Sequence, residues 1–132
     1  MEIMYRQDAI PSAEQIIELY GLAGLPRPIH DLYRIKKIYA NSNLVITAWH
    51  DQKLVGVARS ITDFAWSCYL ADLAIHPEFQ KSGIGTQLIQ LTKSAVGDET
   101  MVLLLSVPTA IDYYPKVGFT KENRAFAMHR VK

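Results

Sequence analysis

Residues 69–86 read YLADLAIHPEFQKSGIGT, and this segment decides the fold. An apolar strand comes first, Pro77 ends it because the residue before a proline stays extended, and a helix follows. Gly83 and Gly85 lack a Cβ atom, so the backbone between them can turn tightly and approach a ligand closely. The first N–H groups of a helix have no partner within it, and they lie at the positive end of the helix dipole. The segment therefore predicts a phosphate-binding loop, with the positive charge of Lys81 beside it.

Composition and charge limit the classes of protein that fit. A chain of 132 residues with 49% hydrophobic and 20% charged residues predicts one folded domain, residues 1–132. Fourteen basic and 13 acidic residues give a formal net charge of +1, so we expect no nucleic-acid or membrane partner. A single cysteine excludes an internal disulfide and fits a reducing compartment. No apolar stretch approaches the roughly 20 residues of a membrane span or resembles a signal peptide, so we expect a cytoplasmic protein.

The remaining sequence alternates helical and strand patterns. Ser12 and Gln15 match a capping box and open an apolar helical face that Gly21 closes. Residues 29–39 predict a second amphipathic helix, and residues 44–62 predict a β-hairpin. A strand, a helix, a second strand, a short helix and one or two closing strands follow at residues 68–76, 85–96, 101–105, 109–117 and 119–131. The strand–helix–strand order predicts a right-handed parallel crossover, and the second of these strands lacks polar alternation, which predicts burial on both faces.

The loop and the element order resemble those of the GNAT superfamily of N-acetyltransferases. The Q-x-x-G-x-G spacing from Gln80 to Gly85 is similar to the pyrophosphate loop of this family. It lacks the G-x-x-x-x-G-K-[ST] pattern of nucleotide loops, and Leu88 replaces the third glycine of a dinucleotide fingerprint. The resemblance implies a mixed α/β sheet (α+β). Its parts would be an N-terminal helical pair, a β-hairpin or meander, a βαβ crossover with the pyrophosphate loop, and a C-terminal short helix with closing strands.

The resemblance also implies acetyl-coenzyme A as the cofactor. In the family, the backbone of the strand before the loop pairs with the pantetheine arm, and one of its N–H groups holds the thioester carbonyl. An asparagine that often contacts the arm is replaced here by Val107, so that contact is not expected. The cofactor-binding residues carried over are Leu73, Ala74, Ile75, Gln80, Lys81, Ser82, Gly83, Ile84, Gly85, Thr86 and Tyr113.

Residues 110–119, AIDYYPKVGF, resemble the family segment A-x-x-[FY]-Y-x-x-x-G-F, and Tyr114 is carried over as the catalytic acid. A phenol has an ordinary pKa of about 10, so at neutral pH it is protonated and can donate to a leaving thiolate. The glutamate base of some relatives is replaced by Tyr69. Asp72 is the nearest carboxylate. It either binds the amine or relays its proton through water, or it is a structural partner of Arg59 or of a backbone N–H.

These observations predict an N-acetyltransferase that moves an acetyl group from acetyl-coenzyme A to a primary amine by direct attack in a ternary complex. No histidine or cysteine spacing suggests a metal. The main alternative is a non-catalytic acyl-coenzyme A binding module, and a nucleotide-binding α/β domain is a weaker one. The acceptor amine has no sequence signature, and a homodimer is an expectation from the family alone.

Overall fold

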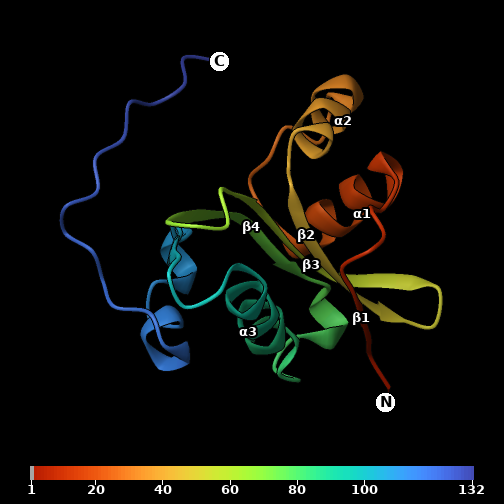
Figure 1. Cartoon of the computed structure of the whole chain (residues 1–132). Coiled ribbons are helices and arrows are strands. Elements are labelled where there is room, and N and C mark those ends of the chain that lie inside the picture. Colours follow the sequence, from red (N-terminus) through yellow and green to blue (C-terminus); the bar gives the residue numbers. More distant parts are fainter. Residues whose placement is uncertain (1) are drawn as a thin grey trace.

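A five-stranded mixed sheet forms the centre of the molecule, with helices on both of its faces (Figure 1). The computed structural model describes residues 2–132. The strands lie in chain order across the sheet and are β1 (Met4–Arg6), β2 (Leu44–His50), β3 (Lys53–Thr62), β4 (Ser67–Ile75) and β5 (Met101–Leu103). The helices are α1 (Ala13–Ala23), α2 (Leu32–Ala40) and α3 (Ile84–Val96). Neighbouring strands are antiparallel except β4 and β5, which are parallel, so the predicted parallel crossover through α3 is confirmed.

The sheet separates two apolar cores. On one face, α3 buries Ile84 and Leu88 against side chains of β2, β3 and β4. On the other face, α1 and α2 bury Ile16 and Ile35 against Val57 and other strand residues. Since both faces are covered, the free surfaces of the sheet are its edges and the ends of its strands.

Local sequence signals explain where the helices begin and end. Ser12 accepts from the backbone N–H of Gln15, whose side chain accepts from the backbone N–H of Ser12, so the predicted capping box begins α1. This helix continues past the predicted end at Gly21 and is capped by Gly24, whose φ of 72° is the left-handed conformation that glycine adopts easily. Asp31 caps α2, which begins later than predicted.

A β-bulge at Ala71 reverses the pleat of β4. On β3, Arg59 lies opposite Asp72 and Ser60 lies opposite Leu70. Ala71 of β4 therefore has no opposite residue. In a regular strand Leu70 and Ala74 would lie on the same face. Here Leu70 packs into the core beneath α3, whereas Ala74 joins the core beneath α1 and α2.

The two parallel strands separate soon after they pair. β4 and β5 pair over three positions, the last of which joins Tyr69 to Leu103. β3 continues to pair with the other edge of β4 as far as Ile75. One edge of β4 is therefore left without a strand, and a cleft opens beside the carboxyl end of β4, a position where α/β sheets commonly bind ligands.

Two strands at the sides of the sheet differ from the prediction. The sequence pattern does not predict β1, whose three residues are too few to show an alternation. The strand predicted at residues 101–105 ends at Leu103, and Met101 is 54% exposed, so burial on both faces is wrong. β5 is the outermost strand of the sheet, and only its inner edge is paired.

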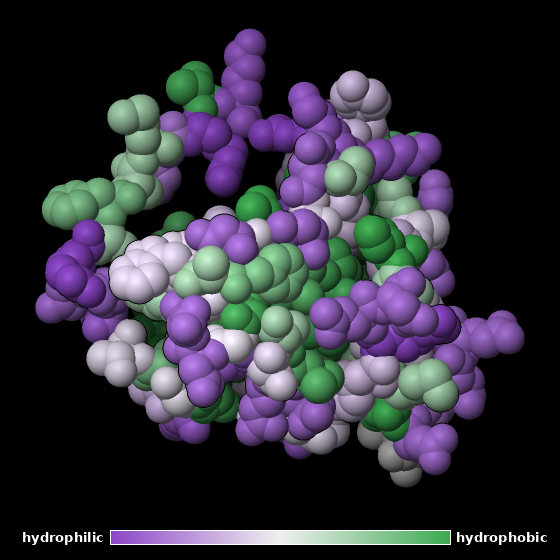
Figure 2. Space-filling view, viewed as in Figure 1, coloured by the Kyte–Doolittle hydropathy of each residue, from purple (hydrophilic) through white to green (hydrophobic). Residues whose placement is uncertain are grey.

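The closing strands predicted for residues 119–131 are wrong. This part of the chain forms no strand and runs as an extended arm that stands clear of the body (Figures 1 and 2). Its end returns to α2, where Arg34 Nη2 donates to the backbone oxygen of Lys132 at 3.3 Å. The large apolar side chains of the arm are almost fully exposed: Phe126, Met128 and Val131. An apolar extended segment favours a strand, but a strand also needs a pairing partner, and this arm pairs with none of the described strands.

The short helix predicted at residues 109–117 is instead a pair of 3₁₀ turns, Pro108–Ala110 and Tyr114–Val117. Each contains a proline in its first two positions, where the missing N–H is tolerated. Among the helices of residues 2–132, none has the length and apolar character to cross a membrane.

Candidate active site

The loop between β4 and α3 has a backbone shaped for an anion. Lys81 and Gly83 have left-handed φ angles of 64° and 86°, which turn the chain tightly in front of the helix. Gly83 caps α3 without a side-chain hydrogen bond, so the N–H groups of the first helical turn stay open toward the loop. Together with the helix dipole and the Lys81 ammonium, these groups form a positive site suited to phosphate.

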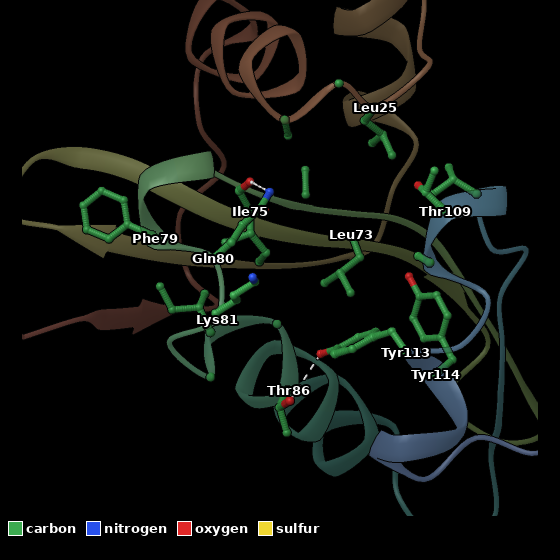
Figure 3. A pocket seen from close by; sticks show the side chains of 18 of the residues that line it. Leu25, Leu73, Ile75, Phe79, Gln80, Lys81, Thr86, Thr109, Tyr113 and Tyr114 are labelled. Carbon is green, nitrogen blue, oxygen red and sulfur yellow. Dashed lines mark hydrogen bonds between the residues drawn. The ribbon is translucent and has the colours of Figure 1, made fainter.

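A hollow of about 830 Å³ begins at this loop and extends along β4 to Tyr114 (Figure 3). All the predicted cofactor residues line it except Ser82, whose hydroxyl donates to the carbonyl oxygen of Phe79 instead. Sequence reasoning missed two further walls, which come from the end of α1 and from the chain after β5: Ala23–Pro26 and Val107–Ala110. The first wall carries no motif. In the second, the family resemblance marks Val107 and Ala110 without predicting that they line the cleft, and the separation of β4 from β5 brings both walls to it. We call this hollow the main cleft.

The free edge of β4 presents two residues to the main cleft. The N–H of His76 donates to Val55 on β3 at 2.8 Å. Because successive residues of a strand direct their backbone groups to opposite sides, Ala74 also turns its groups to β3. Leu73 and Ile75 therefore direct theirs to the open side, and Gln80 Nε2 donates to the Ile75 carbonyl there at 3.2 Å. Of the three residues predicted for backbone pairing, this alternation favours Leu73 and Ile75.

Tyr113 covers the start of α3. Its hydroxyl lies 3.2 Å from Thr86 Oγ1, and a Cβ atom on Gly85 would lie 3.0 Å from the same hydroxyl (Figure 3). The missing side chain of Gly85 thus makes room for the tyrosine, a reason for this glycine that the sequence motif does not reveal.

Tyr114 stands at the far end of the main cleft, at the start of a 3₁₀ turn. Its ring is packed edge-on against Tyr113 and Phe119, with centroid distances of 5.2 and 5.6 Å. Its hydroxyl points toward Thr109 (Figure 3). Burial, and secondarily the neighbouring Tyr113, raises the pKa of Tyr114 above its ordinary value. The phenol therefore stays protonated at neutral pH and is able to donate a proton.

Asp72 lies outside the main cleft, within a buried network between β4 and the helix pair. Its carboxylate accepts from Arg59 Nε at 2.6 Å, from Arg27 Nε at 2.6 Å and from the Tyr20 hydroxyl at 2.7 Å. Burial by itself would raise the pKa of Asp72, but the hydrogen bonds and charges of the arginines outweigh it and hold the pKa below its ordinary value. A fully engaged carboxylate of low pKa is a poor proton acceptor, and the structural partnership with Arg59 considered from the sequence is present.

The part of the main cleft that the structure describes holds no carboxylate or imidazole to act as a general base. Its described lining includes no Asp, Glu or His, and its one charged residue is Lys81. Tyr69, at the position of the glutamate in some relatives, is 38% exposed where β4 still pairs with β5. Within residues 2–132, no three His, Cys, Asp or Glu side chains gather as a metal site would require.

The fold and the cleft define an α/β protein with a ligand cleft beside an unpaired strand edge, and comparison with known proteins identifies its family. The acetyltransferase (GNAT) domain family matches residues 41–121. An uncharacterized N-acetyltransferase, ycf52, from Pyropia yezoensis is 30% identical over 128 residues, which cover 88% of this chain and 72% of that protein. The chain therefore belongs to the GNAT family of acetyltransferases.

Solved structures agree with this fold. A probable acetyltransferase from meticillin-resistant Staphylococcus aureus superposes with a TM-score of 0.84 over 99% of both chains at 20% identity. AAC(6')-Iy, solved in complex with the bisubstrate analogue CoA-S-monomethyl-acetylneamine, superposes with a TM-score of 0.73 at 16% identity, covering 98% of this chain and 99% of that one. At these identities the likeness establishes the fold alone.

Proposed function

We propose that this protein transfers an acetyl group from acetyl-coenzyme A to a primary amine, which attacks directly in a ternary complex. One observation carries the proposal: a single cleft joins the open N-terminus of α3 to Tyr114 along the unpaired edge of β4. The relative named as an N-acetyltransferase and the structural neighbour bound to a coenzyme A analogue support it.

The residues of the main cleft fit the parts of this cofactor. Acetyl-coenzyme A, when bound, supplies the acetyl group as a thioester. The first turn of α3 and Lys81 would hold the pyrophosphate. The backbone groups of Leu73 and Ile75 would pair with the amides of the pantetheine arm as a neighbouring strand does. One of these N–H groups would donate to the thioester oxygen as negative charge develops on it.

Proton transfer is divided between Tyr114 and water. The Tyr114 hydroxyl would donate its proton to the departing sulfur, a role for which its raised pKa keeps it protonated. Since no carboxylate or imidazole is among the described residues that line the main cleft, the amine would lose its proton to water. Asp72 would act as a positioning residue, because its carboxylate ties Arg27, in the connection between α1 and α2, to β4.

Calorimetric titration with acetyl-coenzyme A tests the cofactor assignment. We expect micromolar binding to the native protein. Gly83→Asp should weaken it by about a hundredfold, roughly 3 kcal/mol, because a carboxylate would stand where the pyrophosphate binds. Gly83→Asn is the matched control, since asparagine has the same shape, tolerates the left-handed conformation and carries no charge. The loss of affinity in Gly83→Asn should be clearly smaller than in Gly83→Asp. A native protein that does not bind acetyl-coenzyme A would overturn the proposal.

Thiol release in the presence of a panel of amines then tests turnover. An enzyme releases coenzyme A in an amine-dependent way, and Tyr114→Phe slows this release. Tight binding of acetyl-coenzyme A with no release for any amine would instead identify a non-catalytic acyl-coenzyme A binding module.

A further inference from the structure

A second hollow continues the main cleft beyond Tyr114. It measures about 90 Å³ and shares five lining residues with the main cleft, so the two hollows meet around the Tyr114 side chain. The shared residues are Leu25, Leu73, Val107, Ala110 and Tyr114. We call this second hollow the distal pocket. If the thioester lies at Tyr114, the distal pocket is where the acceptor lies, because the main cleft is taken by the cofactor.

Apolar side chains make up most of the lining of the distal pocket, and its one charged residue, among those described, is Arg27. Five leucines and several smaller apolar residues line it, together with Arg27 and Tyr114. The side chain of Arg27 is 26% exposed. No carboxylate lines either hollow among the residues that the structure describes. An acceptor with several positive charges, such as a polyamine or an aminoglycoside, would therefore meet only cations, namely Arg27 and Lys81.

Arg27 keeps both charge and donors for a ligand. Its Nε donates to Asp72, its Nη1 to the Pro26 carbonyl at 2.7 Å and its Nη2 to the Ala71 carbonyl at 2.8 Å. Each of the two Nη atoms carries a second N–H that takes part in none of these hydrogen bonds. Arg27 and Arg59 share the single carboxylate of Asp72, so this group of three side chains carries one positive charge in excess. A buried or half-buried charge is costly unless it is paired, and a carboxylate matches the planar fork of a guanidinium.

We propose that the acceptor is a small amine that bears a carboxylate next to an apolar substituent, an amino acid of short aliphatic side chain being the simplest example. This inference rests on the proposed function and names its substrate class. Arg27 receives the carboxylate, and the leucines enclose the substituent. The distal pocket is small, at about 90 Å³, which favours a short aliphatic side chain over a sugar ring.

The transfer balances with the groups already named. The ammonium first loses a proton to water. The amine nitrogen then forms a bond to the acetyl carbon, and the carbon–sulfur bond breaks. The sulfur leaves as a thiol with the proton of Tyr114, which regains a proton from water, and the nitrogen gives its second proton to water. The product is an N-acetylated amino acid whose carboxylate remains on Arg27.

Product binding tests this inference without requiring turnover. N-acetyl-L-leucine and N-acetyl-L-leucinamide differ only in the carboxylate, and both can be titrated into the native protein with and without coenzyme A. We expect the carboxylate to bind at least tenfold more tightly than the amide. Arg27→Met should abolish this preference, whereas Arg34→Met, which removes an exposed arginine of α2, should keep it.

The native comparison is decisive even if Arg27→Met does not fold. Equal affinity for the two ligands, tighter binding of the amide, or no binding of either at millimolar concentration would overturn the inference. Coenzyme A titrated into the same sample separates the two proposals. If coenzyme A binds but the carboxylate is not preferred, only the proposed substrate class is wrong. If the carboxylate is preferred but coenzyme A does not bind, the proposed function is wrong and Arg27 is an anion site.

Discussion

The hydroxyl of Tyr113 lies over Gly85, so close that a Cβ atom on this glycine would stand 3.0 Å from the hydroxyl oxygen. The same Cβ would lie 3.8 Å from the ring carbon that bears the hydroxyl, an ordinary contact distance. The conflict is therefore confined to one oxygen atom. Gly85 at the start of α3 and Tyr113 in the wall of the main cleft are thus packed closely together. Substitutions of either residue test this contact.

Gly85→Ala should displace Tyr113 and weaken the binding of acetyl-coenzyme A by about tenfold, or ~1.4 kcal/mol. Tyr113→Phe alone should have a small effect, because it removes only the oxygen and its contact with Thr86. In the double variant the phenylalanine fits over the alanine, so binding should recover much of the loss. Calorimetry on the four proteins gives the coupling energy, and additive losses would show that the two residues are independent.

Tyr114→Phe should lower kcat by about a hundredfold or more while leaving the affinity for acetyl-coenzyme A nearly unchanged. The ring and its edge-on packing remain, and only the proton donor is lost. Because burial raises the pKa of Tyr114, any decline in kcat from tyrosine ionisation should begin at a higher pH than an ordinary phenol would give. Steady-state kinetics between pH 6 and 10 check both points. Unchanged kcat in the variant would assign the proton donation to water.

Asp72→Asn should cost about 3–5 kcal/mol of unfolding free energy at pH 7, because it leaves the buried Arg59 and the half-buried Arg27 without their carboxylate. The pKa of Asp72 is lowered in the folded protein, so its contribution to stability is full above the unfolded pKa and is lost as pH falls through the folded pKa. The difference between native protein and variant should thus shrink in acid, below about pH 4. Urea unfolding of both proteins at several pH values measures this difference in unfolding free energy.

The control for this series is Asp98→Asn, which alters an exposed carboxylate after α3. Its unfolding free energy should stay within about 0.5 kcal/mol of the native value. A loss for Asp72→Asn that is equally small would mean that the ion pairs of Asp72 contribute nothing net, as some buried ion pairs do.

The tight loop before α3 and the place of Tyr114 at the main cleft could be predicted because each depends on residues adjacent in sequence. Gly83, Lys81 and the start of α3 fall within a few positions, and their conformations follow from local rules. The surroundings of Asp72 follow from no local rule. Tyr20 and Arg27 approach it from 52 and 45 residues away, through the packing of α1 and the connection after it onto the sheet.

The bulge at Ala71 explains a second difference. Simple alternation places Leu70, Asp72 and Ala74 on one face of β4, which makes an isolated acid in an apolar row and suggests a functional role. The bulge turns Asp72 toward the helix pair, where Arg59 and its other partners lie. A single unpaired residue in a ladder leaves no reliable mark in the sequence, yet it changes which side chains meet.

The C-terminal arm gives the sharpest contrast between sequence pattern and structure, and truncation tests it. Its apolar side chains are exposed, so removal of residues 124–132 should change the unfolding free energy by less than about 1 kcal/mol. Thermal and urea unfolding of the shortened chain measure this change, and shortening from residue 128 instead gives a graded comparison. A loss of several kcal/mol would mean that the arm pairs with the outer edge of β5 in solution, as the closing strands predicted from the sequence would. A small loss would mean that the sheet ends at β5 and that the cleft beside β4 is complete without the arm.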